Sequence, residues 1–148
     1  MEDKVTQYLN AIYQNTKTAI QSIENIILKS KDESLTKELS QEGAVYASLA
    51  EQCERFAERN NIDGIKDNNW FEKAKLWTSI NMGTLMDKST RNIAEMMLLG
   101  TFMGVITCTK DKFDHKNVSA ELDEIMEKLL NFERENINKL IPFLNKNK

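Results

Sequence analysis

Three glutamates stand where amphipathic helices normally place apolar side chains. Glu42 and Glu133 each fill one position in a run of apolar residues spaced by three and four, and Glu95 is the one charge in the apolar stretch 93–109. Burying a carboxylate without a partner is costly, so each group needs a proton, a cation or hydrogen-bond donors. Residues that break the local pattern in this way are candidates for a ligand site, a metal site or a buried hydrogen-bond network.

Counting residues along the predicted helices places other polar side chains at a similar depth in the bundle. If consecutive helices alternate in direction, several polar residues lie about 14 or 15 residues from a shared end of the bundle. They are Thr16, Tyr46, Glu95 and Glu133, with Glu42 about one turn away and Asn136 as a further hydrogen-bond donor. We therefore expect the three carboxyl groups to meet near the middle of the bundle.

Four amphipathic segments must position these residues. Apolar side chains at helical spacing predict helices over about 3–30, 33–60, 69–110 and 119–145. The third segment would be about 63 Å long if it were unbroken, which is far longer than its neighbours. A kink or break is therefore expected near 87–90, where Ser89 can cap a new helix. The chain is predicted to form a single all-α domain over residues 1–148, an up-down four-helix bundle.

The stretch 93–109 is apolar or small on every side except at Glu95. Gly100 and Gly104 lie four residues apart and clear one helix face, so another backbone or a ligand can approach closely. The uncharged run 96–109 is 14 residues long, short of the ~20 that cross a bilayer. We expect this to be the central buried helix, which packs within the bundle or across a homodimer, and no membrane is expected as a partner.

Charge and the start of the chain limit the other partners. The net charge of -3 arises from 20 basic and 23 acidic residues that are interleaved, without a basic block that would follow phosphates, so nucleic acid is not expected as a partner. The charged start 1–4 runs directly into an amphipathic helix, which is not typical of a signal or transit peptide. A cytoplasmic location is therefore expected.

The two cysteines, Cys53 and Cys108, each lie among apolar residues. Neither belongs to a CxxC pair or has a histidine nearby in the sequence. Buried, unreactive thiols are expected, and a disulfide or a redox role is the alternative.

Two stretches of sequence have a family resemblance. They are 9–17, which reads LNAIYQNTK, and 89–97, which reads STRNIAEMM and is followed by Gly100 and Gly104. The chain resembles the ferritin-like superfamily, most closely the uncharacterised small ferritin-like four-helix-bundle proteins of Gram-positive bacteria. The resemblance spans most of the chain and implies a ferritin-like fold.

A metal-binding member of that superfamily would carry Glu-x-x-His pairs on two of its helices. In this chain the residues three positions after Glu42, Glu95 and Glu133 are Val45, Leu98 and Asn136. The one histidine, His115, lies between charged residues in an expected loop. We therefore expect no metal and no cofactor. The alternative that stays open is a site for a hard ion made only of Glu42, Glu95 and Glu133.

Three functions are compatible with this pattern. We favour a non-enzymatic, metal-free ferritin-like domain that acts as a structural or interaction module and forms a homodimer through an apolar helix surface. The first alternative is a bundle that binds an unidentified small molecule, with the three glutamates lining a cavity opened by the glycines. The second is a degenerate ferritin-like protein that binds metal through carboxylates alone.

Overall fold

The structure is a computed structural model that describes residues 3–63, 65 and 87–146. Within these ranges the chain forms four α-helices, a short 3-10 helix and no strand, which confirms the predicted all-α bundle. The elements are α1 (Lys4–Ile27), α2 (Glu33–Arg59), α4 (Thr90–Asp114), α5 (Ala120–Leu140) and η1 (Ile141–Asn145).

The first residue of each α-helix follows a side chain that caps it. The capping residues are Asp3, Asp32, Ser89 and Ser119, and each accepts a hydrogen bond from a backbone N–H in the first turn. These caps satisfy donors that have no partner inside the helix. Near 87–90, where a kink or break is predicted, residues 87–89 are not helical and α4 begins at Thr90. The earlier part of the predicted third helix, 69–86, lies outside the described residues.

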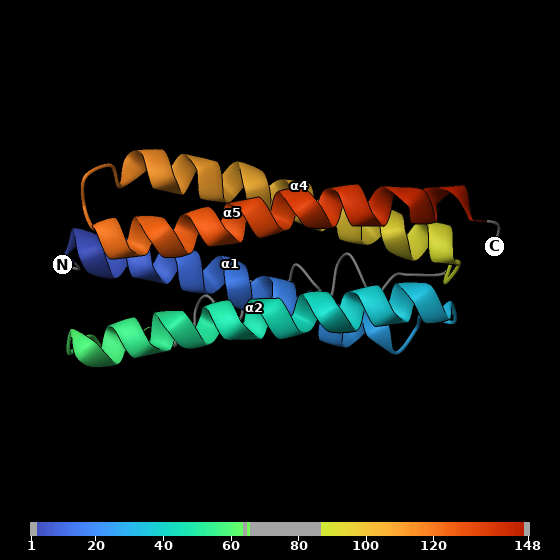
Figure 1. Ribbon diagram of the computed structural model, residues 1–148, viewed down its shortest axis with the longest axis horizontal. Coiled ribbons are helices and arrows are strands. Elements are labelled where there is room, and N and C mark those ends of the chain that lie inside the picture. Colours follow the sequence, from blue (N-terminus) through green and yellow to red (C-terminus); the bar gives the residue numbers. More distant parts are fainter. Residues whose placement is uncertain (1–2, 64, 66–86, 147–148) are drawn as a thin grey trace.

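Contacts at the two ends of the bundle fix the directions of the helices (Figure 1). At one end, Arg59 after α2 pairs with Glu121 at the start of α5. At the other end, Lys146 lies 3.0 Å from Asp32, which caps the start of α2. Arg91, at the start of α4, donates to the carbonyl oxygen of Leu144 at 2.8 Å. Both α4 and α2 therefore begin at the same end, and these two helices run parallel.

This parallel pair corrects the expectation of strict up-and-down order. Only short connections force neighbouring helices to be antiparallel, as they do between α1 and α2 and between α4 and α5. The longer connection from α2 to α4 instead joins opposite ends of the bundle, because α2 ends beside the start of α5 and α4 begins beside the residues that follow α5. The depths counted from a shared end are not affected, because α1 and α5 begin at the end of the bundle where α2 and α4 finish.

The core lies where the apolar faces of the four helices meet. Tyr8, Leu9 and Ile12 of α1 are fully buried there, as are Leu122 and Leu129 of α5. The most extensive contacts join α1 to α2 and α4 to α5, so the bundle consists of two helical hairpins packed together.

Helix α4 is buried on one side only, which corrects the expectation of a central buried helix. Its buried residues are Ile93, Ala94, Met97, Leu98, Thr101 and Cys108. The opposite side exposes Leu99, Phe102, Met103 and Ile106 to solvent. Among the described residues α4 is also the one helix that is long and apolar enough to cross a membrane, a criterion that core helices of soluble proteins meet as well.

Candidate functional site

Three side chains from α2 and α5 form a buried hydrogen-bonded group. The Tyr46 hydroxyl donates to Oε2 of Glu133 at 3.1 Å, and Nδ2 of Asn136 donates to the Tyr46 oxygen at 3.4 Å. Glu133 and Asn136 are three residues apart on α5 and so share one helix face. The Cys108 thiol of α4 lies 3.9 Å from Oε1 of Glu133. The carboxyl group of Glu133 is therefore held between a phenol and a thiol, with 1% of the residue exposed.

The environment of Glu133 favours its protonated form at neutral pH. Burial raises the pKa of this carboxyl group to about 8, even though the hydrogen bonds from Tyr46 and Cys108 act to lower it. A neutral carboxyl group can both donate and accept a hydrogen bond, whereas the ionised form only accepts. Glu133 can therefore change its charge in response to a bound molecule near physiological pH.

Glu42 is a second buried carboxyl group, with 1% of the residue exposed. It lies on α2, one turn before Tyr46. Neither of its oxygens has a donor among the described side chains. Burial raises the pKa of Glu42 well above its usual range, and the neighbouring carboxyl group of Glu38 adds to this effect. Two ionised carboxylates cannot form a hydrogen bond with each other, but a protonated Glu42 can donate a hydrogen bond to Glu38. The favoured form of Glu42 is therefore also neutral.

Two of the expected site residues do not join this group. Thr16 is fully buried, but its hydroxyl donates to the carbonyl oxygen of Ile12 at 2.8 Å, within its own helix. Glu95 is exposed. Because each residue of a helix turns by about 100°, Glu95 lies on the far side of α4 from the buried Ile93. The structure thus brings two carboxyl groups into the core in place of three.

The described glutamates do not form a cluster of three carboxylates. In the part of the chain that the structure describes, no group of three or more His, Cys, Asp or Glu side chains is placed to hold a metal ion. His115 makes its contacts elsewhere, because its ring stacks on Tyr8 and its Nδ1 lies 2.7 Å from the carbonyl oxygen of Asp111. The carboxylate-only alternative therefore loses the third of its three ligands.

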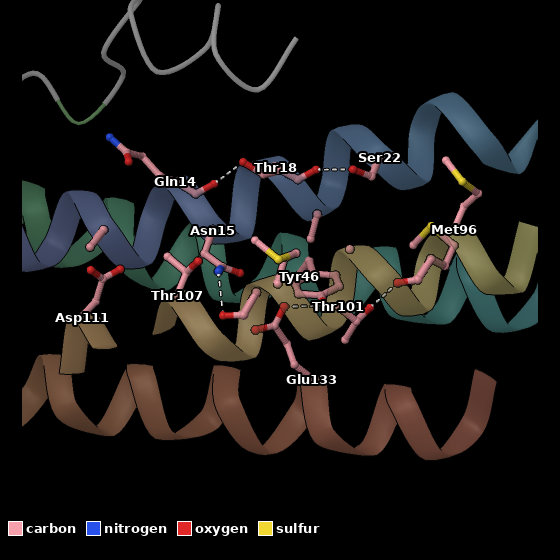
Figure 2. Close-up of a pocket in the computed structure, with 16 residues that line it drawn as sticks. Gln14, Asn15, Thr18, Ser22, Tyr46, Met96, Thr101, Thr107, Asp111 and Glu133 are labelled. Atoms are coloured by element: carbon pink, nitrogen blue, oxygen red, sulfur yellow. Dashed lines mark hydrogen bonds between the residues drawn. The ribbon is translucent and has the colours of Figure 1, made fainter. Parts of the chain in front are cut away.

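A cavity of about 510 Å³ lies between α1 and α4, and Glu133 and Tyr46 reach it from α5 and α2 (Figure 2). Apolar parts of its wall come from the small residues Ala11 and Ala19 of α1 and from methionines 96, 97 and 103 of α4. Polar groups along the same wall are Gln14, Asn15, Thr18, Ser22, Thr101, Thr107 and Asp111. The hydrogen-bonded group in the core is therefore accessible from one side.

Gly104 is what allows the Glu133 carboxyl group to reach the cavity. A Cβ atom at this position would lie 2.6 Å from Oε2 of Glu133, which is closer than real Cβ contacts. The carbonyl oxygen of Gly104 also accepts a hydrogen bond from Nδ2 of Asn15 at 3.2 Å, which ties α1 to α4 at the cavity. Gly100 lines the same cavity. The glycine face thus lies inside the bundle, where it makes room for a carboxyl group and a cavity.

The cavity carries acidic groups without a basic counterpart. Its described wall contains the carboxyl groups of Glu133 and Asp111 and no Lys, Arg or His. Burial raises the pKa of Asp111, although the nearby His115 and Lys110 act in the opposite direction. Such a wall disfavours anions and favours cations or neutral molecules.

Several of these residues were not singled out from the sequence. Asn15 and Asp111 resemble ordinary polar positions of amphipathic helices, and only the contact between α1 and α4 places them together. Cys53 and Cys108 are buried free thiols, as predicted, but the sequence contains no sign that Cys108 faces Glu133. The glycine pair at 100 and 104 was the one signal in the sequence for close approach at this place.

Comparison with known proteins adds no relative. No protein-family model, no curated protein and no solved structure matches the chain.

Proposed function

We propose that this protein binds a small apolar amine in the cavity between α1 and α4, with Glu133 as its counter-charge. The observation that carries the proposal is a buried carboxyl group that faces a cavity whose described wall has no basic side chain. The volume of about 510 Å³ lies within the range of small-molecule sites, and the mixture of methionine and alanine with a few polar groups is typical of them.

Glu133 would act by exchanging a proton for the cationic head of the ligand. In the empty cavity its pKa of about 8 keeps most of the group neutral at pH 7. An ammonium group beside it favours the ionised form, so binding releases the carboxyl proton. Tyr46 and Cys108 stay in place to donate to the carboxylate that results. The methionine side chains of α4 can adjust to the apolar part of the ligand.

The frame around the cavity is, in this proposal, a ferritin-like bundle without its metal ligands. What supports it is the connectivity, since ferritin-like bundles have one long crossover connection and the α2–α4 pair runs parallel. The absence of Glu-x-x-His pairs in the sequence and the exposed position of Glu95 favour an organic ligand over a metal.

The proposal is tested by titration calorimetry with three probes of equal chain length: octylamine, octan-1-ol and octanoate. We expect octylamine to bind most tightly and octanoate not to bind. At pH 7, heats measured in buffers of different ionisation enthalpy should show close to one proton released for each octylamine bound. Affinity should rise between pH 6 and pH 8, because a larger fraction of Glu133 is already ionised.

Two glutamine variants distinguish the site from the general charge of the protein. Glu133→Gln keeps the shape of the side chain but not its charge, so octylamine binding should weaken at least about tenfold. Glu135→Gln removes an exposed carboxyl group two residues further along α5 and should bind octylamine like the unchanged protein. Equal binding of all three probes, or a Glu133→Gln variant with unchanged affinity, would contradict the proposal.

A further inference from the structure

The exposed side of α4 has an apolar stripe that no described element covers. We define the α4 stripe as Leu99, Phe102, Met103 and Ile106, which are between 49% and 57% exposed. Their spacing of i, i+3, i+4 and i+7 puts them on one helix face. Single exposed apolar residues are common, whereas a contiguous row of four large ones is typical of a surface that contacts a partner.

One charged residue lies one turn beyond each end of the α4 stripe. Glu95 precedes Leu99 by four residues, and Lys110 follows Ile106 by four. Both are exposed, and neither takes part in an ion pair among the described residues. The stripe therefore ends in a negative charge on one side and a positive charge on the other.

The α4 stripe and its two end charges are complementary to those of a second copy related by a two-fold axis. A two-fold axis that passes between Phe102 and Met103 places each residue opposite the one equally far from the midpoint. Leu99 then faces Ile106 of the second copy, and Glu95 faces Lys110 of the second copy. A parallel arrangement would instead put like charges beside each other at both ends, which is unfavourable. An interface of this kind, in which the same patch serves on both subunits, is the commonest form of dimer.

We propose that the α4 stripe is the interface of an antiparallel homodimer, with Glu95 of each chain paired to Lys110 of the other. The apolar residues supply the contact area and the two charge pairs fix the direction and register. The cavity lies on the neighbouring face of α4 and shares Met103 with the α4 stripe, while most of its wall comes from residues outside the stripe, which dimer formation leaves free. The proposal does not depend on the ligand inferred above.

Sedimentation equilibrium of the full chain tests the dimer directly. We expect a mass near twice the 17.1 kDa of one chain at micromolar concentrations. Ile106→Lys should raise the dissociation constant at least about 100-fold, because it buries an unpaired charge at the interface. Leu28→Lys is the matched control, since Leu28 is an exposed apolar residue outside α4 and its replacement should leave the mass unchanged.

A charge exchange tests the register. Glu95→Lys and Lys110→Glu should each weaken the dimer about tenfold, because each puts like charges opposite one another. The double variant with both changes restores opposite charges and should return to within about threefold of the original dissociation constant. Circular dichroism should show the same helical content for all variants.

Three outcomes would overturn the proposal. A monomer at about 100 μM would do so, as would a double variant no better than the single ones. Binding of the unchanged monomer to vesicles of phosphatidylcholine and phosphatidylglycerol would assign the stripe to a bilayer instead.

Discussion

Replacing Gly104 by alanine tests the close approach of α4 to the carboxyl group of Glu133. In the interior of an exposed helix this change normally stabilises a protein by about 0.5–1 kcal/mol, because glycine loses more backbone freedom on folding. At position 104 the added Cβ would lie 2.6 Å from Oε2 of Glu133 and 3.1 Å from both its Cδ and its Oε1. The carboxyl group must therefore move away from α4 and from its present hydrogen-bond partners.

That movement disturbs the hydrogen bond from Tyr46, which is 3.1 Å long. A buried polar group that loses its partner costs about 1–3 kcal/mol, which exceeds the gain from the alanine. We expect Gly104→Ala to lower the free energy of unfolding by up to about 2 kcal/mol. The same change should reduce the affinity for octylamine, since the methyl group occupies the place through which Glu133 reaches the cavity.

Gly43 provides the matched control in the middle of α2. A Cβ at this position would meet only Cγ2 of Ile23 at 3.6 Å, an ordinary contact. Gly43→Ala should therefore show the usual helical gain of about 0.5–1 kcal/mol. Urea unfolding followed by circular dichroism at pH 7 measures both variants. If Gly104→Ala were stabilised as much as Gly43→Ala, the close fit between α4 and Glu133 would be refuted.

Further predictions concern the buried carboxyl groups. The folded-state pKa of Glu133 is about 8 and its ordinary value is 4.5, so between these values the folded protein keeps a proton that the unfolded chain has lost. Stability should therefore fall as pH rises from about 4.5 to about 8, by at most about 1.4 kcal/mol per pH unit for each such group, and urea unfolding across this range measures it. Stability that rises with pH over the same range would contradict the inferred burial. Glu42→Gln removes one titrating group and should make this dependence less steep, whereas Glu24→Gln at an exposed position of α1 should not. Glu42→Met should raise the free energy of unfolding at pH 8 by about 1 kcal/mol or more, because an apolar side chain of similar size replaces a buried ionisable one, and a loss of stability would show that Glu42 is better satisfied than its contacts suggest.

The helices of this protein could be predicted from its sequence because their signals are local. Asp32, Ser89 and Ser119 are good capping residues beside the start of an apolar pattern, and α2, α4 and α5 begin directly after them. The regular spacing of apolar residues also gave the facing sides of α2 and α5. Tyr46 and Glu133 occupy the seam positions of those two helices, and the structure joins their side chains.

The same reasoning failed on α4 because its sequence has almost no polar side. Periodicity assigns a buried face only when polar residues mark the exposed one, and the stretch 93–109 has a single charge. Glu95 looked like a polar residue in a buried helix, but it marks the exposed face. The direction of α4 was also not predictable, because a long connection allows either a parallel or an antiparallel return.

The two buried carboxyl groups separate the stability of the fold from its proposed activity. Glu42 and Glu133 both weaken the folded state as pH rises, because the folded protein keeps protons on these buried groups that the unfolded chain loses. Of the two, Glu133 alone lines the cavity. A bound amine can therefore reach its carboxylate and offset the free-energy cost of ionising it. Octylamine should therefore stabilise the protein more at pH 8 than at pH 6 when Glu42 is replaced by glutamine, and should lose this pH dependence when Glu133 is replaced. If both variants responded alike, Glu133 would be a structural residue with no direct role in binding.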